Sequence, residues 1–413
     1  DRGLYGANFH FETEAATEFG EKKLVADLFA AEPGTVGTRE EFRGTGGSLY
    51  FLQRQDVLAG SERVRIEIRD KASGIVTGVV NLVPAMDYDI DYLQGRILLT
   101  NPLSSNVDDS LLVRTDAVSG DEAYLVVRYE YTPGFDDIDA VATGGQVAYW
   151  FGDHVKLGVT SNVNDQDDSD SSMNAADLTL RYSAGSWFKL QQARSEGLVA
   201  LPVVSDDGGF GFSSYDPNDF VDAEAEARRA DISVNLGDFV EFTDAQFNFY
   251  IQEVDAGYSA PGLTALADTE NVGGSLTLPI GERFSFRAKA DNRAQDQGVE
   301  LNTQEYNLGY EFNQHWDVRA GYRRDERTDN SVIVPLTQEQ GTRADAVIQV
   351  GYNSRSTWDA YLFAQDTLST TGDRQENSRA GIGGSYRLSD KLRLEGEISD
   401  GDLGLGGRIG TNY

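Results

Sequence analysis

The stretch "YWFGDHVKLGVTSN", residues 149–162, sets a pattern that returns throughout this chain. Apolar side chains alternate with polar or small ones on both sides of a Gly-Asp pair at 152–153. Alternation with a period of two is typical of a β-strand whose two faces meet different surroundings. A turn this short joins antiparallel strands. The stretch therefore predicts a tight hairpin with one apolar face.

Similar hairpins are predicted around residues 184–185, 237–238, 281–282, 313–314 and 389–390. Each arm alternates over about eight to twelve residues, the length with which a tilted strand crosses a bilayer. Long acidic stretches, such as 162–175 and 196–226, join the other strand ends. Short turns at one end and long loops at the other are typical of an outer-membrane barrel. A soluble β-protein such as a propeller is the alternative, but no blade-like repeat is visible.

We therefore predict an all-β protein, a transmembrane antiparallel β-barrel of about 16–18 visible strands. Aromatic residues beside the short turns would form a girdle at the membrane interface: Trp150, Phe151, Phe284, Trp316 and Tyr386. If the short turns face the periplasm, the first strand starts outside. The visible chain is then expected to lack an upstream strand or to be a piece of a larger protein.

The composition argues against disulfides, thiolate metal sites and nucleic-acid binding. The 413 residues contain no Cys and three scattered His, and the formal net charge is −33. Without Cys there is no disulfide framework and no thiolate metal site. Nucleic acid is not expected as a partner, because binding phosphates needs a basic surface.

Residues 36–133 differ in sequence pattern from the first hairpin (1–35) and the main barrel (134–413). Their strands are shorter, with turns at 59–60, 73–74 and 94–95. The block predicts an inserted small β-sandwich-like domain with its own core, because an unstructured loop of that length would be unusual. This domain would plug or cap the barrel.

The segment "DYDIDYLQGRI", residues 87–97, resembles the DY-x-[IV]-DY-x-x-G-x-[IV] segments of β-domains inserted in very large Gram-negative outer-membrane barrels. The translocon barrel of the type 9 secretion pathway is one of them. The resemblance covers only this short stretch, and it implies a domain that plugs, lids or docks at a barrel. Fimbrial ushers have a comparable layout, but no usher motif is visible.

Two groups of carboxylates are candidate Ca²⁺ ligands, because Ca²⁺ prefers several oxygen ligands. The first follows one strand face and the second lies in an acidic loop: Asp87, Asp89 and Asp91; Asp165, Asp167, Asp168 and Asp170. A solvated acidic surface is the alternative for both groups. The first could instead pair with the row Arg63, Arg65 and Arg69. No other cofactor is expected.

Charged residues also fall on the inferred inward rows of the barrel strands. These lumen-lining candidates are Arg181, Arg229, Arg287, Lys289, Arg293, Arg319, Arg323, Arg387, Arg393, Glu395 and Glu397. Mixed rows of this kind either cross-link the barrel interior or create a positive potential that favours anionic solutes.

No catalytic signature is visible. There is no G-x-S-x-G elbow, and "GTGGS" (44–48) lacks the Lys of a phosphate-binding loop. An enzyme is not predicted, because a barrel enzyme acting on lipid would need a nucleophile–base pair and none can be located in the sequence.

We predict a channel or translocation pore in the outer membrane of a Gram-negative bacterium, partly occluded by the inserted domain and passing solutes or a polypeptide. Its long loops would be extracellular and its short turns periplasmic. Lipid, lipopolysaccharide bridged by divalent cations, and other outer-membrane or periplasmic chains are the expected partners. The alternative is a surface-exposed adhesive or structural protein that the barrel anchors.

Overall fold

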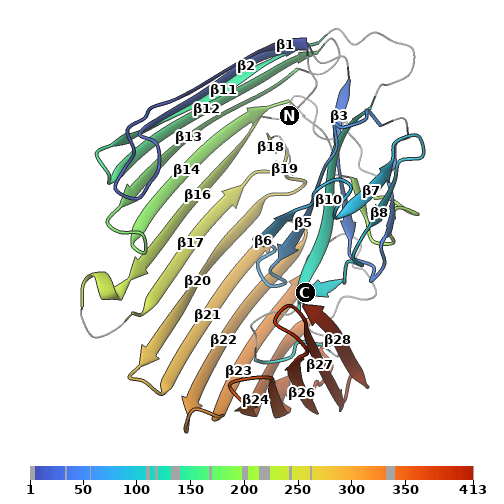
Figure 1. Cartoon of the computed structure of the whole chain (residues 1–413), viewed down its shortest axis with the longest axis vertical. Helices are drawn as coiled ribbons and strands as arrows, with labels where there is room; N and C mark the ends of the chain where they lie inside the picture. Colours follow the sequence, from blue (N-terminus) through green and yellow to red (C-terminus); the bar gives the residue numbers. More distant parts are fainter. Residues whose placement is uncertain are drawn as a thin grey trace. The chain divides into compact units, whose positions relative to one another are not determined.

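The computed structural model describes residues 5–32, 35–55, 57–107, 112–116, 120–131, 140–166, 170–197, 203–213, 224–240, 244–260, 263–331 and 340–412. Their regular secondary structure is β-strand, with most strands labelled in Figure 1, apart from one short 3-10 turn at Leu236–Asp238. In this part of the chain, no helix has the length and apolar character needed to cross a membrane.

Seventeen strands form one large antiparallel sheet. They are β1 (Tyr5–Glu12), β2 (Leu24–Glu32), β11 (Ala140–Phe151), β12 (Val155–Gln166), β13 (Ser171–Arg181), β14 (Trp187–Glu196), β16 (Glu224–Asn235), β17 (Gln246–Val254), β20 (Thr269–Ile280), β21 (Phe284–Gln295), β22 (Val299–Glu311), β23 (Trp316–Asp329), β24 (Gly341–Asn353), β25 (Trp358–Thr370), β26 (Arg379–Arg387), β27 (Arg393–Gly401) and β28 (Gly406–Asn412).

The hairpin predicted at 149–162 is formed by β11 and β12, which pair from Phe151 opposite Val155 onward. Gly152 takes a positive φ of 66° in the turn, a conformation that glycine adopts without strain. The strands run further than the sequence suggested. The expected loop 162–175 is mostly strand, because polar pairs such as Ser161 and Asn174 continue the ladder and share a 2.8 Å hydrogen bond.

The two faces of the large sheet differ in the way that the alternation predicts. On one face the apolar side chains are exposed, for example Ile348 (54%) and Leu362 (60%). On the other, charged side chains are buried, for example Glu305 (3%) and Asp345 (1%). This inversion of a soluble protein's pattern is the one that a transmembrane β-barrel has, so the predicted all-β fold class is confirmed.

One aromatic residue departs from the predicted girdle. Phe151, Phe284, Trp316 and Tyr386 are exposed on the apolar face, whereas Trp150 is only 6% exposed. Adjacent strand residues point to opposite faces, so Trp150 and Phe151 cannot both meet lipid. Trp150 instead lies under the guanidinium of Arg181, 4.1 Å from its ring centre.

Strands between residues 36 and 131, together with β15 (Val203–Ser205), form two further sheets, which share a core built around Phe42, Tyr50, Tyr88, Ile97 and Leu125. The six-stranded sheet contains β3 (Val36–Arg43), β5 (Arg63–Arg69), β6 (Val76–Asn81), β9 (Asn106–Val107), β10 (Asp121–Tyr131) and β15 (Val203–Ser205). The three-stranded sheet contains β4 (Leu49–Phe51), β7 (Tyr88–Asp91) and β8 (Arg96–Leu99).

Strand β15 is a feature that the sequence did not predict. It comes from the stretch 196–226, which was expected to be a loop, and it pairs in parallel with β3. Its hydrogen-bonding groups are thus satisfied by an edge strand of a distant segment. Another two-stranded piece joins β18 (Ser259–Ala260) and β19 (Leu263–Thr264).

By its contacts the chain divides into two compact units. The first comprises residues 1–107, 121–231 and 252–269, and the second comprises 108–120, 232–251 and 270–413. The predicted limits of an inserted domain at 36 and 133 stay a prediction. Segment 108–120 belongs to the second unit although it connects two strands of the six-stranded sheet, β9 and β10.

Charged residues of the first unit form a network on one face of the six-stranded sheet. Arg69 contacts Glu41 and Glu67 at 2.7 Å each, and Arg39 reaches Glu41 at the same distance. Arg65 and Arg69 of β5 therefore pair with carboxylates of β3 and β5 rather than with the row at Asp87 that the sequence offered as a partner.

On its other face the six-stranded sheet buries an acid in the apolar core. Glu40 is fully buried, where its carboxylate accepts hydrogen bonds from the Tyr129 hydroxyl and, at 2.9 Å, from the Gln53 backbone N–H. Burial raises the pKa of Glu40 to about 7 in spite of these bonds.

Candidate functional site

Residues 112–116, which we call the strap, lie on the polar face of the second unit. They form neither strand nor helix. Leu112 and Val113 pack with Val347 of β24 and Phe363 of β25 in a small buried cluster. The strap therefore has no regular secondary structure, yet its residues 112–115 are buried.

Arg114 is the central side chain of the strap and is 8% exposed. Its Nη2 donates to Glu397 Oε2 at 2.8 Å, and its guanidinium lies 3.7 Å from the ring centre of Phe363. The hydroxyl of Tyr361 donates to the same Glu397 carboxylate at 2.5 Å. A buried guanidinium thus has both a counter-charge and a flat ring to stack on, which satisfies the conditions for burying a charge.

The backbone of the strap is satisfied by side chains of the sheet. Gln365 accepts from the Arg114 N–H at 2.8 Å and donates to the Arg114 carbonyl at 2.9 Å. Asn377 donates to the same carbonyl at 2.7 Å. Arg343 donates to the Thr115 carbonyl at 2.6 Å and Arg379 to the carbonyl that follows at 2.5 Å. A buried segment outside regular structure needs such partners, and here they come from three strands and the loop before β26.

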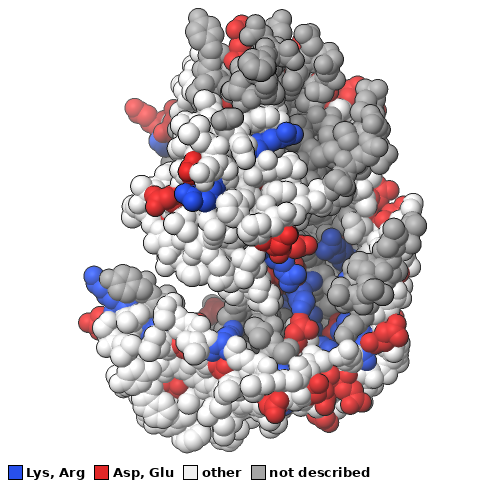
Figure 2. All heavy atoms as spheres, turned by 90° about the vertical axis from the view of Figure 1, so that its right-hand side faces the viewer, with Lys and Arg blue, Asp and Glu red and all other residues white. Residues whose placement is uncertain are grey.

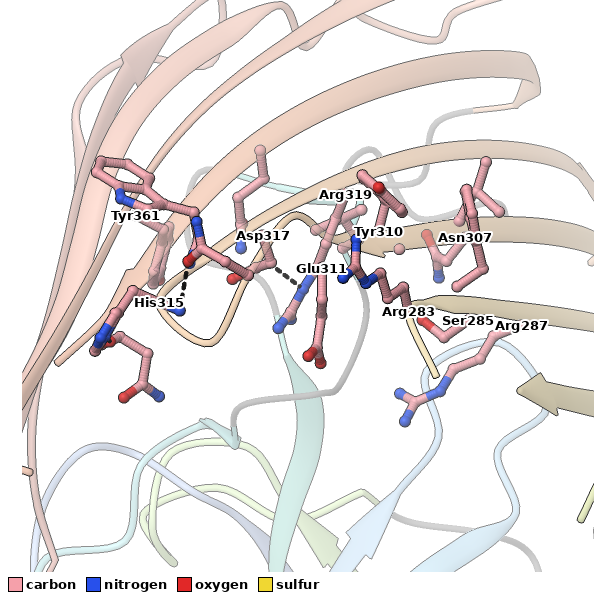
Figure 3. Close-up of a pocket in the computed structure, with 18 of the residues that line it drawn as sticks. Arg283, Ser285, Arg287, Asn307, Tyr310, Glu311, His315, Asp317, Arg319 and Tyr361 are labelled. Carbon is pink, nitrogen blue, oxygen red and sulfur yellow. Dashed lines mark hydrogen bonds and ion pairs between the residues drawn. The ribbon is translucent and has the colours of Figure 1, made fainter. Parts of the chain in front are cut away.

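A pocket of about 730 Å³ adjoins the strap at the short-turn ends of β20 to β25. Figure 3 shows side chains of neighbouring strands converging on it. The lining contains six arginines and three carboxylates: Arg114, Arg283, Arg287, Arg319, Arg355 and Arg408; Glu282, Glu311 and Asp317. The pocket is therefore basic within a strongly acidic chain, even after Glu397, the partner of Arg114, is added to the acids.

The charges of the pocket are not all neutralised by one another. Arg319 donates to Asp317 at 2.9 Å, and Arg355 donates to the Gln314 carbonyl at 2.5 Å. Within the described part of the chain, neither Arg283 nor Arg287 has an ion-pair partner. Elsewhere on the surface acidic and basic side chains lie side by side, as Figure 2 shows for one face. The pocket thus offers guanidinium groups to a ligand.

The structure brings three of the predicted lumen-lining residues to this site. Arg287 and Arg319 line the pocket, and Glu397 holds the strap. The other candidates lie on polar-face rows or in ion pairs: Arg323 with Glu305 at 3.1 Å, Lys289 with Asp291 at 3.4 Å, Arg393 with Asp359 at 2.6 Å, Arg229 with Asp231 at 2.8 Å, Arg181 with Glu21, and Arg293, Arg387 and Glu395 on strands β21, β26 and β27.

One of these pairs lies at a short turn of the first unit. Arg181, at the end of β13, hydrogen-bonds Glu21 in the β1–β2 connection, and that hydrogen bond lowers the pKa of Glu21 to about 2. Ion pairs of this kind favour cross-linking at these positions, one of the two readings that the sequence left open.

The candidate Ca²⁺ ligands that the structure describes are not gathered into a site. Asp87 and Asp91 accept hydrogen bonds from the backbone of nearby turns, at 2.8 Å from Val83 and 3.1 Å from Gln94, while Asp89 is exposed on β7. Asp165 lies in β12 and Asp170 just before β13, and Asp167 and Asp168 lie outside the described residues. Across the residues that the structure does describe, no group of three or more His, Asp or Glu could hold a metal ion.

Sequence reasoning missed the strap. Residues 112–116 fell inside the predicted inserted domain, and "LLVRTD" (111–116) has no turn signal or alternation long enough to mark a strand. The available signal was a single arginine in a short apolar run between polar stretches. Such a pattern gives no indication of its partner, because Glu397 lies far along the chain.

No family model and no curated protein matches the sequence. Among solved structures, the chain is similar to a mutant of the ferric enterobactin receptor from Pseudomonas aeruginosa, with 10% identity and a TM-score of 0.28. The alignment covers 96% of this chain and 61% of the receptor. A likeness at this level assigns neither a family nor an activity.

Proposed function

We propose that the chain forms an outer-membrane β-barrel channel or translocation pore. The strap and the strands of the predicted inserted domain (36–133), which we call the inserted strands, would partly occlude it. It would pass solutes or a polypeptide across the outer membrane of a Gram-negative bacterium, with long loops outside and short turns in the periplasm. The observation that carries the proposal is the burial of the strap against the polar face of a sheet whose other face is apolar and exposed.

The physical argument starts from the apolar face. Exposed rows of Leu, Ile and aromatic side chains over many adjacent strands are costly in water and favourable in lipid. If lipid covers that face, the polar face encloses water, and a sheet of 17 strands can surround an aqueous channel. A segment buried on the polar face then narrows that channel.

The strap supports a regulated rather than a permanently open channel. It is held by discrete polar contacts, with Arg114 and Glu397 at their centre, and not by continuous sheet pairing. Side-chain contacts of this kind can break without disturbing the hydrogen-bonded ladder of the large sheet, so the strap could be released while the barrel stays folded. Lipopolysaccharide and further outer-membrane or periplasmic chains are the partners proposed for the loops and the inserted strands.

A planar-bilayer experiment tests the proposal. The full chain, purified in detergent, is compared with a variant in which residues 112–116 are replaced by a Gly-Ser segment of equal length. We expect the variant to conduct more than the parent, because the bore is wider. Arg324→Ala is the matched control, since this arginine is exposed and its pair with Glu326 spans 3.5 Å. Absence of conductance in both the parent and the strap variant would refute the channel.

A second function, a surface adhesive or structural protein anchored by the barrel, is favoured by one observation. Large apolar side chains of the first unit are exposed outside the large sheet: Met86 (72%), Leu93 (74%) and Phe210 (79%). Exposed apolar groups outside the membrane-facing rows fit a protein partner. This alternative predicts a chain that stays silent in bilayers but whose surface binding is lost when these three residues become serine.

A further inference from the structure

We propose that the pocket beside the strap is a binding site for a small anion that carries carboxylate or phosphate groups. This proposal names a class of solute for the proposed channel. That the anion is transported rests on the proposed function, whereas its binding does not. The site itself stands on the residues that line the pocket.

The first observation is the register of three neighbouring strands. Ser285 of β21 lies opposite Gly309 of β22, and Gly309 lies opposite Arg319 of β23. One step along, Arg287 lies opposite Asn307. Adjacent strands are about 4.8 Å apart, so the two arginines are rooted on strands separated by about 10 Å. Figure 3 shows Ser285, Arg287 and Asn307 together at one side of the pocket.

Glycines on the polar face leave room for polar side chains that line the pocket. A Cβ on Gly309 would lie 2.6 Å from the hydroxyl oxygen of Ser285, and one on Gly351 would lie 2.5 Å from a carboxylate oxygen of Asp317. Larger residues at these positions would therefore displace Ser285 and Asp317 from their places in the pocket lining. The pocket volume of about 730 Å³ is that of a small-molecule site and is too small for a folded partner.

The second observation is that polar groups in the pocket lining lack partners within the described residues. Arg283 and Arg287 lack an ion-pair partner among the described residues, and an arginine fork matches a carboxylate or phosphate in a bidentate way. In the same part of the chain, the buried Oδ1 of Asn307 accepts no hydrogen bond. A ligand that also carries a hydroxyl group would supply the missing donor.

The nearby acids limit which anions fit. Glu311 and Asp317 line the same pocket, and Asp317 already engages Arg319 at 2.9 Å. A long polyanion would meet these carboxylates as well as the arginines, whereas a compact one can face Arg283 and Arg287 alone. The geometry therefore favours a small hydroxylated carboxylate or phosphate over an extended acidic chain.

Calorimetry on the full chain in detergent micelles tests the site without relying on conductance. Citrate, a hydroxylated carboxylate, is titrated in one arm and inorganic phosphate in the other, which distinguishes the two anion chemistries. We expect at least one of them to bind, with an affinity that falls as salt rises. Arg287→Gln and Arg283→Gln should each weaken that binding by about tenfold or more, because each removes a charge-assisted hydrogen bond.

Arg324→Gln is the matched control, because it removes one positive charge from the same sheet outside the pocket. Its affinity should stay within about twofold of the parent. The inference is overturned if neither anion binds the parent, if both pocket variants bind as the parent does, or if the control loses as much affinity as they do. A parent that conducts but binds neither anion refutes this site alone, and one that binds but never conducts refutes the channel alone.

Discussion

Replacing Arg114 with alanine should loosen the strap while the large sheet stays folded. The substitution removes the 2.8 Å bond to Glu397 and the stacking on Phe363 at 3.7 Å. The Glu397 carboxylate keeps the Tyr361 hydroxyl and the positive charge of Arg408, which lies opposite it on β28. Breaking a buried ion pair by removing one partner costs about 3–5 kcal/mol. Since about 1.4 kcal/mol is a factor of ten, the open population of the strap should rise by roughly 140- to 4000-fold.

Hydrogen exchange followed by mass spectrometry measures this opening directly. The informative amide is the backbone N–H of residue 114, which donates a 2.8 Å hydrogen bond to Gln365 in the parent. This N–H is still present in Arg114→Ala, so its exchange can be compared between the two proteins. Peptides that cover residues 112–116 should exchange faster in Arg114→Ala, and peptides from β22 should not change.

Two further variants sharpen the test of Arg114. Arg114→Met combined with Glu397→Met removes both charges, so it should recover part of the protection that Arg114→Ala loses. Arg324→Ala, which breaks an exposed pair, should leave the strap unchanged. If exchange in the strap is the same in the parent and in Arg114→Ala, the ion pair does not hold the strap and the reasoning is wrong.

Two other predictions concern the core of the six-stranded sheet and the packing under the strap. Burial raises the folded-state pKa of Glu40 to about 7, above its ordinary 4.5. Between pH 4.5 and 7 the folded protein therefore keeps a proton on Glu40 that the unfolded chain has lost. The contribution of Glu40 to stability is therefore largest below about pH 4.5 and falls by about 3 kcal/mol as the pH rises to 7; thermal melting of Glu40→Gln should lack this part of the pH dependence. Gly321→Ala should destabilise the strap by about 1–3 kcal/mol, because its Cβ would lie 3.1 Å from Leu112 and 2.7 Å from Asn307 Oδ1. Gly407→Ala, where the nearest atom is 3.5 Å away, is the control in the same exchange experiment, and equal exchange in both variants would contradict this prediction.

Alternation made the large sheet predictable. A period of two fixes which residues share a face, so the hairpins at Gly152 and Asn313 and the opposed rows of Tyr322 and Arg323 follow from local sequence. Strand ends were less predictable. Beyond the apolar band both faces are polar, and nothing in residues 162–166 distinguishes a strand from a loop until its partner is known.

The strap and the pocket depend on pairings that local sequence does not carry. Arg287 and Arg319 could be assigned to the polar face by counting, but that they line one pocket depends on the pairing of β21, β22 and β23. Arg114 meets Glu397 only because residues 112–116 fold onto a distant sheet. Contacts of long sequence separation such as this one have no periodic signature.

The central claim is that lipid covers the exposed apolar face, and tryptophan quenching in reconstituted bilayers tests it most directly. Single-tryptophan variants keep Trp316 (48% exposed), Trp358 (42%) or Trp150 (6%) in turn. We predict that brominated lipids quench Trp316 and Trp358 strongly and Trp150 weakly, since Trp150 lies on the opposite face. Strong quenching of Trp316 and Trp358 by aqueous iodide, with no effect of brominated lipid, would contradict the account.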